Sequence, residues 1–286
     1  MDMLVSTAWL ADAIRHQAGD AGANIHIVDA TYFLPEAERD AAAEYAAEHI
    51  PGALYLDLTA LVDAASPFPN MLPPAAQFVR RIADLGIGSG ARIVLYDNSP
   101  HRTAARAWWM FRLFGLSDVV LLDGGLAKWR AEGRALDSGQ ADPTPGVFTA
   151  RQVDASHRTK AQVADALRSG EAQILDARSA ARFTGEEPET RPGLASGHIP
   201  GSINIPYGRL FAADGSWQSA DGLRAVFREA GVDMEIPVIT TCGSGITAAI
   251  LSFGLALLGK ADVALYDGSW SEWGADPATP KATGAA

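Results

Sequence analysis

The chain contains the stretch IPVITTCGSGITAAILSFGLALL at residues 236–258, where an apolar run leads through a glycine-containing loop into a second apolar run. The first run is rich in β-branched residues and predicts a strand over 237–241, and the second predicts a helix over 246–258. Cys242, the only cysteine, lies between them. Because ligands of open α/β sheets bind beyond the carboxyl ends of the strands, this stretch indicates both a fold class and a site.

The loop after Cys242 is suited to hold a negative charge. Gly243 and Gly245 allow the backbone to approach a bound sulfur or anion closely. Backbone amides of the loop lie directly before a helix; they belong to Gly243, Ser244, Gly245, Ile246 and Thr247. Inward-facing amides and a helix N-terminus both stabilise a thiolate. Free cysteine is also among the most buried residue types, so a structural thiol is the alternative. The context favours a catalytic nucleophile, and a sulfur sealed in the core would contradict that interpretation.

The chain repeats itself. Three motifs recur in the same order, and the two Asp-Gly motifs are offset by 267 − 123 = 144 residues. So many ordered matches indicate two copies of one domain. The matched pairs are Val28-Asp29-Ala30 with Leu175-Asp176-Ala177, Glu48-His49-Ile50-Pro51-Gly52-Ala53 with Gly197-His198-Ile199-Pro200-Gly201-Ser202, and Leu122-Asp123-Gly124-Gly125 plus Trp129 with Tyr266-Asp267-Gly268-Ser269 plus Trp273. The two tryptophans are expected to be structural anchors, and the two His-Ile-Pro-Gly turns rigid entries into strands.

Each copy alternates short apolar strands with helices. In the second copy we expect strands over 173–176, 202–206, 237–241 and 262–266, and a helix over 223–230. This alternation predicts an α/β fold in which a mainly parallel sheet is flanked by helices. The stretch from Gly133 to Gly146 is rich in Gly, Pro, Asp and Ser and predicts a linker. The expected organisation is one domain over 1–135, a linker over 136–150 and a second domain over 151–286.

Composition excludes several classes of function. The 286 residues carry a net charge of −11, which argues against nucleic acid and anionic membranes as partners. No apolar stretch reaches the length of a membrane span, and the first 15 residues do not resemble a secretory signal. One cysteine excludes an intramolecular disulfide, so a cytoplasmic location is expected. The six histidines and one cysteine show no ligand spacing, so we expect neither metal nor organic cofactor.

Two other chemistries match the loop in part. Residues 243–248 fit the dinucleotide-binding pattern G-x-G-x-x-A, but they lie in the last α/β unit, and the first copy lacks these glycines. A phosphatase loop of the form Cys-x5-Arg would need an arginine where Ala248 stands, so that chemistry is rejected.

Arg182 and Arg191 flank a polar segment that contains a proline. From spacing alone they are expected to be solvated arginines that balance neighbouring glutamates. The functional alternative is a carboxylate clamp, because guanidinium binds a carboxylate bidentately.

Taken together, these residues resemble the two-domain rhodanese superfamily over nearly the whole chain. Within it, the segment 242–248 is similar to the loop of members that use 3-mercaptopyruvate. Members that use thiosulfate typically carry basic residues directly after the cysteine, where this chain has Gly243 and Ser244. The resemblance implies two tandem rhodanese-like domains, of which the first is catalytically silent and carries Asp97 near the place of the cysteine.

The resemblance also implies site residues. It assigns Cys242 and Ser244 to catalysis, and it places Arg182 and Arg191 on the carboxylate of the substrate, in preference to the solvated role. Some members are proposed to use a Ser-His-Asp relay. Here Asn70 replaces the histidine and Thr59 the aspartate, so a complete relay is not expected.

The implied reaction moves sulfur from 3-mercaptopyruvate to Cys242 as a persulfide, with release of pyruvate. A thiol, a thioredoxin-like protein or cyanide then accepts the sulfur. Thiosulfate sulfurtransferase is the alternative enzyme, and a rhodanese-like binding or redox-sensing module, in which Cys242 is merely oxidised, is the alternative without catalysis.

Overall fold

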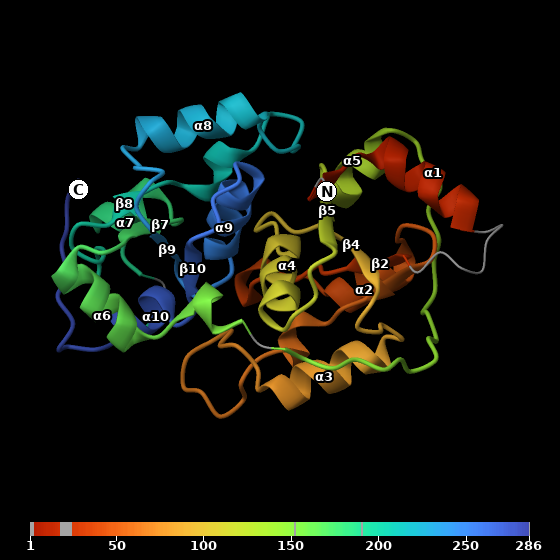
Figure 1. The fold of residues 1–286 in the computed structure, drawn as a ribbon, viewed down its shortest axis with the longest axis horizontal. Helices are drawn as coiled ribbons and strands as arrows, with labels where there is room; N and C mark the ends of the chain where they lie inside the picture. The colour runs from red at the N-terminus through yellow and green to blue at the C-terminus, as the bar shows by residue number, and fades with distance from the viewer. Residues whose placement is uncertain (1–2, 18–24, 152, 190, 286) are drawn as a thin grey trace. The chain divides into compact units, whose positions relative to one another are not determined.

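The computed structural model describes residues 3–17, 25–151, 153–189 and 191–285, and its contacts divide the chain into two compact units. Each unit contains one five-stranded sheet (Figure 1). Unit 1 comprises Met1–Val62, Pro73–Val153 and Ala213–Trp217, and unit 2 comprises Asp63–Leu72, Asp154–Ala212 and Gln218–Ala286.

Strands and helices alternate in unit 1. Its elements in chain order are β1 (Leu4–Val5), α1 (Thr7–Gln17), β2 (Ile25–Asp29), the 3₁₀ turn η1 (Pro35–Ala37), α2 (Ala41–Ala47), β3 (Ala53–Tyr55), η2 (Leu58–Ala60), α3 (Ala75–Asp84), β4 (Arg92–Tyr96), α4 (Ala104–Leu113), β5 (Val119–Leu122) and α5 (Gly125–Ala131).

Unit 2 repeats this alternation. Its elements are η3 (Asp154–Ser156), β6 (His157–Arg158), α6 (Lys160–Ser169), β7 (Gln173–Asp176), α7 (Ala180–Thr184), β8 (Ile203–Asn204), η4 (Tyr207–Leu210), α8 (Ala220–Glu229), β9 (Val238–Thr241), α9 (Ala248–Leu257), β10 (Val263–Tyr266) and α10 (Ser269–Trp273).

All strand pairs in the two sheets are parallel. The orders are β1-β5-β4-β2-β3 and β6-β10-β9-β7-β8, which are the same order in the two repeats. Asp29 pairs with Tyr96 in the first sheet, as Asp176 pairs with Thr241 in the second. Every residue of β5 and β9 is buried, and so is every residue of β4 after Arg92, as expected for parallel strands covered on both faces. The predicted α/β class and the duplication are confirmed.

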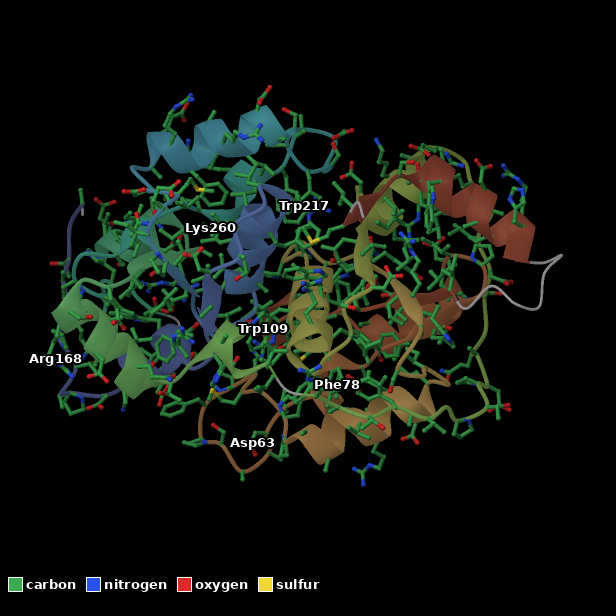
Figure 2. The ribbon with its side chains drawn as sticks, viewed as in Figure 1. Asp63, Phe78, Trp109, Arg168, Trp217 and Lys260 are labelled. Atoms are coloured by element: carbon green, nitrogen blue, oxygen red, sulfur yellow. The ribbon has the colours of Figure 1, made fainter. Side chains whose placement is uncertain are left out.

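Helices pack on both faces of the first sheet. On one face, Ile27, Val94 and Val120 of the strands join a core with residues of α1, α2 and α5. α4 packs on the strands β4 and β5. The fully buried Phe78 of α3, which is labelled in Figure 2, stacks on the ring of Phe114 at 4.3 Å. Both sheet faces are therefore covered, so the carboxyl ends of the strands are the edge left for a site.

Unit 2 shows why its helices form where they do. Thr159 caps α6, because its side chain accepts from the backbone amide of Gln162. The side chain of Gln162 in turn accepts from the backbone amide of Thr159. α9 is apolar on every side and packs against β9 and β10, which is the pattern of a buried helix. α9 begins at Ala248, two residues later than predicted, because the residues before it form the loop after Cys242.

The domain prediction needs two corrections. Residues 136–150 are not a free linker. Backbone hydrogen bonds join Gly139 to Ala46 and Gly146 to Ala83, and the division between the units falls at Val153 and Asp154. The repeats also exchange short segments, since Asp63–Leu72 belongs to unit 2 and Ala213–Trp217 to unit 1 (Asp63 and Trp217 are labelled in Figure 2).

The exchanged segments are held by the repeated Asp-Gly motifs. The amide of Leu72 donates to the carboxylate of Asp267, and the amide of Trp217 donates to Asp123 at 2.8 Å. The associated tryptophans are buried anchors, as predicted, and their indole N–H groups donate to backbone carbonyls. Among the described residues, no helix is both long enough and apolar enough to cross a membrane.

Candidate active site

Cys242 directly follows β9, the central strand of its sheet. The direction of strand addition reverses between β7 and β9. From β7 the chain adds β8 on one side, and it then adds β9 and β10 on the other side. Open α/β sheets bind ligands at such a switch point, beyond the carboxyl ends of the strands. The cysteine thus stands at the edge that the sequence indicated.

The thiol is more enclosed than a nucleophile on an open loop, since Cys242 is only 2% exposed. Its surroundings do reach solvent. Gly243 is half-buried, and the Arg182 side chain is 30% exposed. A Cβ placed on Gly243 would lie 3.2 Å from Nη2 of Arg182. The partly exposed Arg182 guanidinium therefore lies next to the residue that follows the buried thiol.

One hydroxyl holds two backbone amides of the loop. The N–H groups of Cys242 and Gly245 donate to Oγ of Ser269 at 3.1 and 3.2 Å. Gly245 has φ of +78°, a conformation that favours glycine. Within the described part of the chain, the loop amides that donate to no protein acceptor are those of Gly243, Ser244, Ile246 and Thr247. Such unsatisfied donors are available to an anion on the sulfur.

Ser269 is a site residue that sequence reasoning missed. It is fully buried, its Oγ lies 3.9 Å from Sγ of Cys242, and it holds the loop through the two amides described above. Its φ of +50° is unfavourable for a residue with a Cβ, by about 1–2 kcal/mol. A signal was present in the repeat, because Gly125 stands at the same place in the first copy with φ of +57°.

Both predicted arginines converge on Gly243. Nη1 of Arg191 donates to Oγ of Ser271 at 2.6 Å, and that hydroxyl donates to the Gly243 carbonyl at 2.6 Å. Arg182 approaches Gly243 from α7. Nε of Arg182 is buried and, among the described residues, has no hydrogen-bond acceptor. The structure thus brings the two arginines to the loop and leaves one guanidinium N–H unused.

A buried ionic network positions Arg182. Its Nη2 donates to Glu189 at 2.5 Å, and the second oxygen of Glu189 accepts from Arg178 at 2.8 Å. Arg178 in turn pairs with Asp176 at 2.6 Å, and the side chains of Arg178, Asp176 and Glu189 are at most 2% exposed. Loss of one partner would leave a buried charge, so this network fixes the position of the Arg182 guanidinium. Spacing gave no sign of it, because Glu189 resembles its exposed neighbours.

Ser244 lies beside Gly243 and is 6% exposed. Its Oγ accepts from Nδ2 of Asn70 at 3.0 Å, and Asn70 belongs to the exchanged segment of unit 2. An amide group donates here and cannot take up a proton. Thr59, at the position expected for the relay aspartate, donates its hydroxyl to Asp57. The observed bonds agree with an incomplete relay.

Comparison with known proteins identifies the family. The model of the rhodanese-like domain matches residues 7–132 and again 159–276. The chain is 42% identical to the 3-mercaptopyruvate sulfurtransferase of Homo sapiens over 272 residues, 94% of this chain and 91% of that protein. It is 41% identical to the thiosulfate sulfurtransferase of Rattus norvegicus over 273 residues, with the same coverage of both chains.

A solved structure agrees over nearly the whole length. SseA of Escherichia coli, described as a 3-mercaptopyruvate sulfotransferase with the rhodanese fold, superposes with a TM-score of 0.85 at 39% identity. The match covers 95% of this chain and 100% of SseA. The chain therefore belongs to the rhodanese family and carries one rhodanese-like domain in each of its two repeats.

Proposed function

We propose that this chain is a sulfurtransferase that takes sulfur from 3-mercaptopyruvate onto Cys242 and releases pyruvate. The observation that carries the proposal is the pair of arginines beside Gly243, next to a loop that has no basic residue of its own. Such a site suits a donor with one carboxylate at a distance from its sulfur. The 42% identity to the human 3-mercaptopyruvate sulfurtransferase supports the same donor.

The first half-reaction forms a persulfide. The Cys242 thiolate attacks the thiol sulfur of the donor, and an S–S bond forms as the bond between that sulfur and C3 breaks. The electron pair passes to carbon as pyruvate enolate. The proton of the donor's thiol passes, directly or through water, to the carbon of the enolate. The persulfide on Cys242 is therefore left as an anion. The free amides of the loop donate to this anion in the manner of an oxyanion hole.

Arg182 and Arg191 orient the donor. We assign the substrate carboxylate to the two guanidinium groups, because Glu189 holds Arg182, and Ser271 holds Arg191, near Gly243. A charge-assisted bond contributes about 1.5–3 kcal/mol, so one arginine can change donor affinity by roughly 10- to 100-fold. Glu189 leaves Arg182 with N–H groups to spare, including its buried Nε.

Ser244 is assigned to the carbonyl oxygen of the donor. Since its Oγ already accepts from Asn70, its own O–H is left to donate. The carbonyl oxygen gains negative charge as the enolate forms, so this bond strengthens during the reaction. Asn70 fixes the serine and takes no proton from it.

The second half-reaction returns the enzyme to the thiolate. A thiol, a thioredoxin-like reductant or cyanide attacks the outer sulfur and carries it away. A cytoplasmic location stays a prediction of the sequence alone.

Thiosulfate is the competing donor. Overall sequence identity hardly separates the two donors, because it is 42% to the human 3-mercaptopyruvate sulfurtransferase and 41% to the rat thiosulfate sulfurtransferase. The loop does separate them. A dianion next to the sulfur would require cations directly after Cys242, where Gly243 and Ser244 stand.

The test compares the two donors with cyanide as common acceptor. We expect kcat/KM for pyruvate release from 3-mercaptopyruvate to exceed that for thiocyanate formation from thiosulfate by about 100-fold. Equal or reversed values would contradict the donor assignment.

Intact-mass spectrometry after treatment with donor alone tests the persulfide. We expect a gain of one sulfur atom in the wild type and none in Cys242→Ser. Failure to gain sulfur, with oxidation of Cys242 by peroxide instead, would favour a redox-sensing module.

A further inference from the structure

Unit 1 contains a cavity of about 440 Å³ that the proposed reaction does not use. It lies at the carboxyl ends of its strands, because Asp29 ends β2 and Asn98 follows β4. All the residues that line it belong to unit 1. The cavity is therefore at the same edge of the first sheet as the candidate active site is of the second.

In unit 2 the corresponding space is filled by the guanidinium of Arg178. This group pairs with Asp176 at 2.6 Å and donates to the carbonyl of Gly197 at 2.8 Å. It also lies over the ring of Trp270, 4.6 Å from the centroid. A carboxylate, a backbone carbonyl and an apolar wall thus form a cradle for a planar cation.

The cavity of unit 1 has retained this cradle without the arginine. By the internal repeat, Asp29 corresponds to Asp176, Glu48 to Gly197 and Leu126 to Trp270, and all three line the cavity. Thr31 stands in the position of Arg178 and is too short to fill the space. The cavity is what remains when an arginine side chain is replaced by threonine.

The charge at the position of Arg182 is also reversed. His198 stacks on Phe183, the residue after Arg182, at 3.7 Å, and His49 stacks on Tyr45 at 4.2 Å. In both pairs Nδ1 of the histidine bonds the backbone carbonyl of its ring partner at 2.8 Å. The residue before Tyr45 is Glu44, which lines the cavity.

The balance of charge in the cavity favours a cation. Two arginines line it, but each is already engaged: Arg39 donates to both oxygens of Glu44 at 2.7 and 2.6 Å, and Arg130 pairs with Glu48. Asp29 is 2% exposed, and its carboxylate accepts from the amide and hydroxyl of Thr31. Among the described residues, no lysine or arginine pairs with it.

We propose that this cavity binds a small guanidinium compound, with the planar cation against Asp29 in the place that Arg178 fills in unit 2. The site is independent of the sulfur-transfer reaction. The same chemistry is offered by a free guanidino compound and by an arginine side chain of a peptide, and a volume of about 440 Å³ admits either.

Calorimetric titration of the whole protein tests the proposal. The probes are methylguanidinium, its neutral isostere methylurea, and acetate as the anion. We expect methylguanidinium to bind with Kd on the order of 1 mM, and the other two to be at least tenfold weaker. Equal binding of methylurea, or preferential binding of acetate, would overturn the proposal. L-Arginine compared with an acetylated, amidated arginine then separates a free compound from a peptide source.

Two variants determine the sign of the charge that is recognised. Asp29→Asn should weaken methylguanidinium binding about tenfold, and Arg39→Gln, which frees Glu44, should strengthen it several-fold. Asp84→Asn changes the charge equally at the end of α3, outside the cavity, and should leave binding unchanged. If Asp29→Asn fails to fold, Arg39→Gln still decides the matter, because weaker binding in that variant would mean an anion site.

Discussion

Asp97 directly follows β4, and Cys242 directly follows β9, the central strands of the two sheets. These two residues occupy the same place in the two repeats. The carbonyl of Asp97 accepts from the Leu126 amide at 3.1 Å, and that of Cys242 accepts from the Trp270 amide at 3.0 Å. Asp97, predicted to lie near the place of the cysteine, therefore stands at that place. The helix begins seven residues after Asp97 and six after Cys242, so the second loop is one residue shorter.

The difference shows what this loop is built to hold. In unit 1 the Asp97 carboxylate accepts from the amides of Ser99 and Ala104, at 2.9 and 2.8 Å. Burial nevertheless raises its pKa to about 6, so the amides offset only part of the cost of burying the charge. In unit 2 the same scaffold surrounds a sulfur, and Ser269 and Arg182 lie near the loop that carries it.

Cys242→Ser is expected to break the comparison most severely. It should lower pyruvate release by on the order of 10⁴-fold or more, because no other cysteine can form the persulfide. Steady-state kinetics with 3-mercaptopyruvate and cyanide measures it. Asp97→Asn, the equivalent change in unit 1, should keep most of the activity, and comparable losses in both variants would mean that unit 1 is not silent.

The pH dependence of stability should reveal Asp97. Burial raises its pKa to about 6 from 3.8, so the folded protein binds this proton more tightly than the unfolded chain does. Its contribution is therefore full below pH 4 and is lost as the pH rises through 6, to the extent of about 3 kcal/mol. Urea unfolding at pH 4 and pH 7 measures the free energy of unfolding of wild type and of Asp97→Asn. Between pH 4 and pH 7 the wild type should lose about that amount of stability relative to the variant. A difference that does not change with pH would contradict the assignment.

Removal of the clamp should affect one donor. Arg182→Ala and Arg191→Ala are each expected to raise KM for 3-mercaptopyruvate by about 10- to 100-fold, because a charge-assisted bond is lost. Initial rates over a range of donor concentrations measure this. Arg168→Ala is the matched control and should leave KM unchanged, because this exposed arginine on α6 (labelled in Figure 2) pairs among the described residues with Asp165 alone. Wild-type KM in both clamp variants would remove the arginines from the substrate site.

Ser269→Gly makes unit 2 resemble unit 1 and should have the smallest effect. It removes the hydroxyl that holds the amides of Cys242 and Gly245, and we expect kcat/KM to fall about tenfold. It also relieves the unfavourable φ, so the melting temperature should change little. Ser269→Ala should lose the same activity and more stability, because it keeps the φ without the bonds. Full activity in both variants would show that the hydroxyl has no part in catalysis.

Local sequence carried much of the prediction. The run from Val238 to Thr241 and the glycines after Cys242 are adjacent in the chain, so their strand and loop could be read directly. Arg182 and Arg191 were found through the family resemblance, whereas their spacing alone had favoured a solvated role. The stretch over 136–150 was misread, because Gly and Pro indicate a break in regular structure but not whether that segment packs.

The sequence by itself determined the duplication, the parallel α/β class and the position of the one thiol at the end of a strand, because each of these depends on periodicity or order along the chain. Only the tertiary structure decided how Cys242 is surrounded: its burial, the hydroxyl of Ser269 from 27 residues away, and the Glu189 carboxylate that holds Arg182. It also decided that Asp29 faces a cavity while Asp176 faces an arginine. The physical reason is that solvation and pairing of charge depend on which distant segments the fold brings together, and nothing in local spacing encodes them.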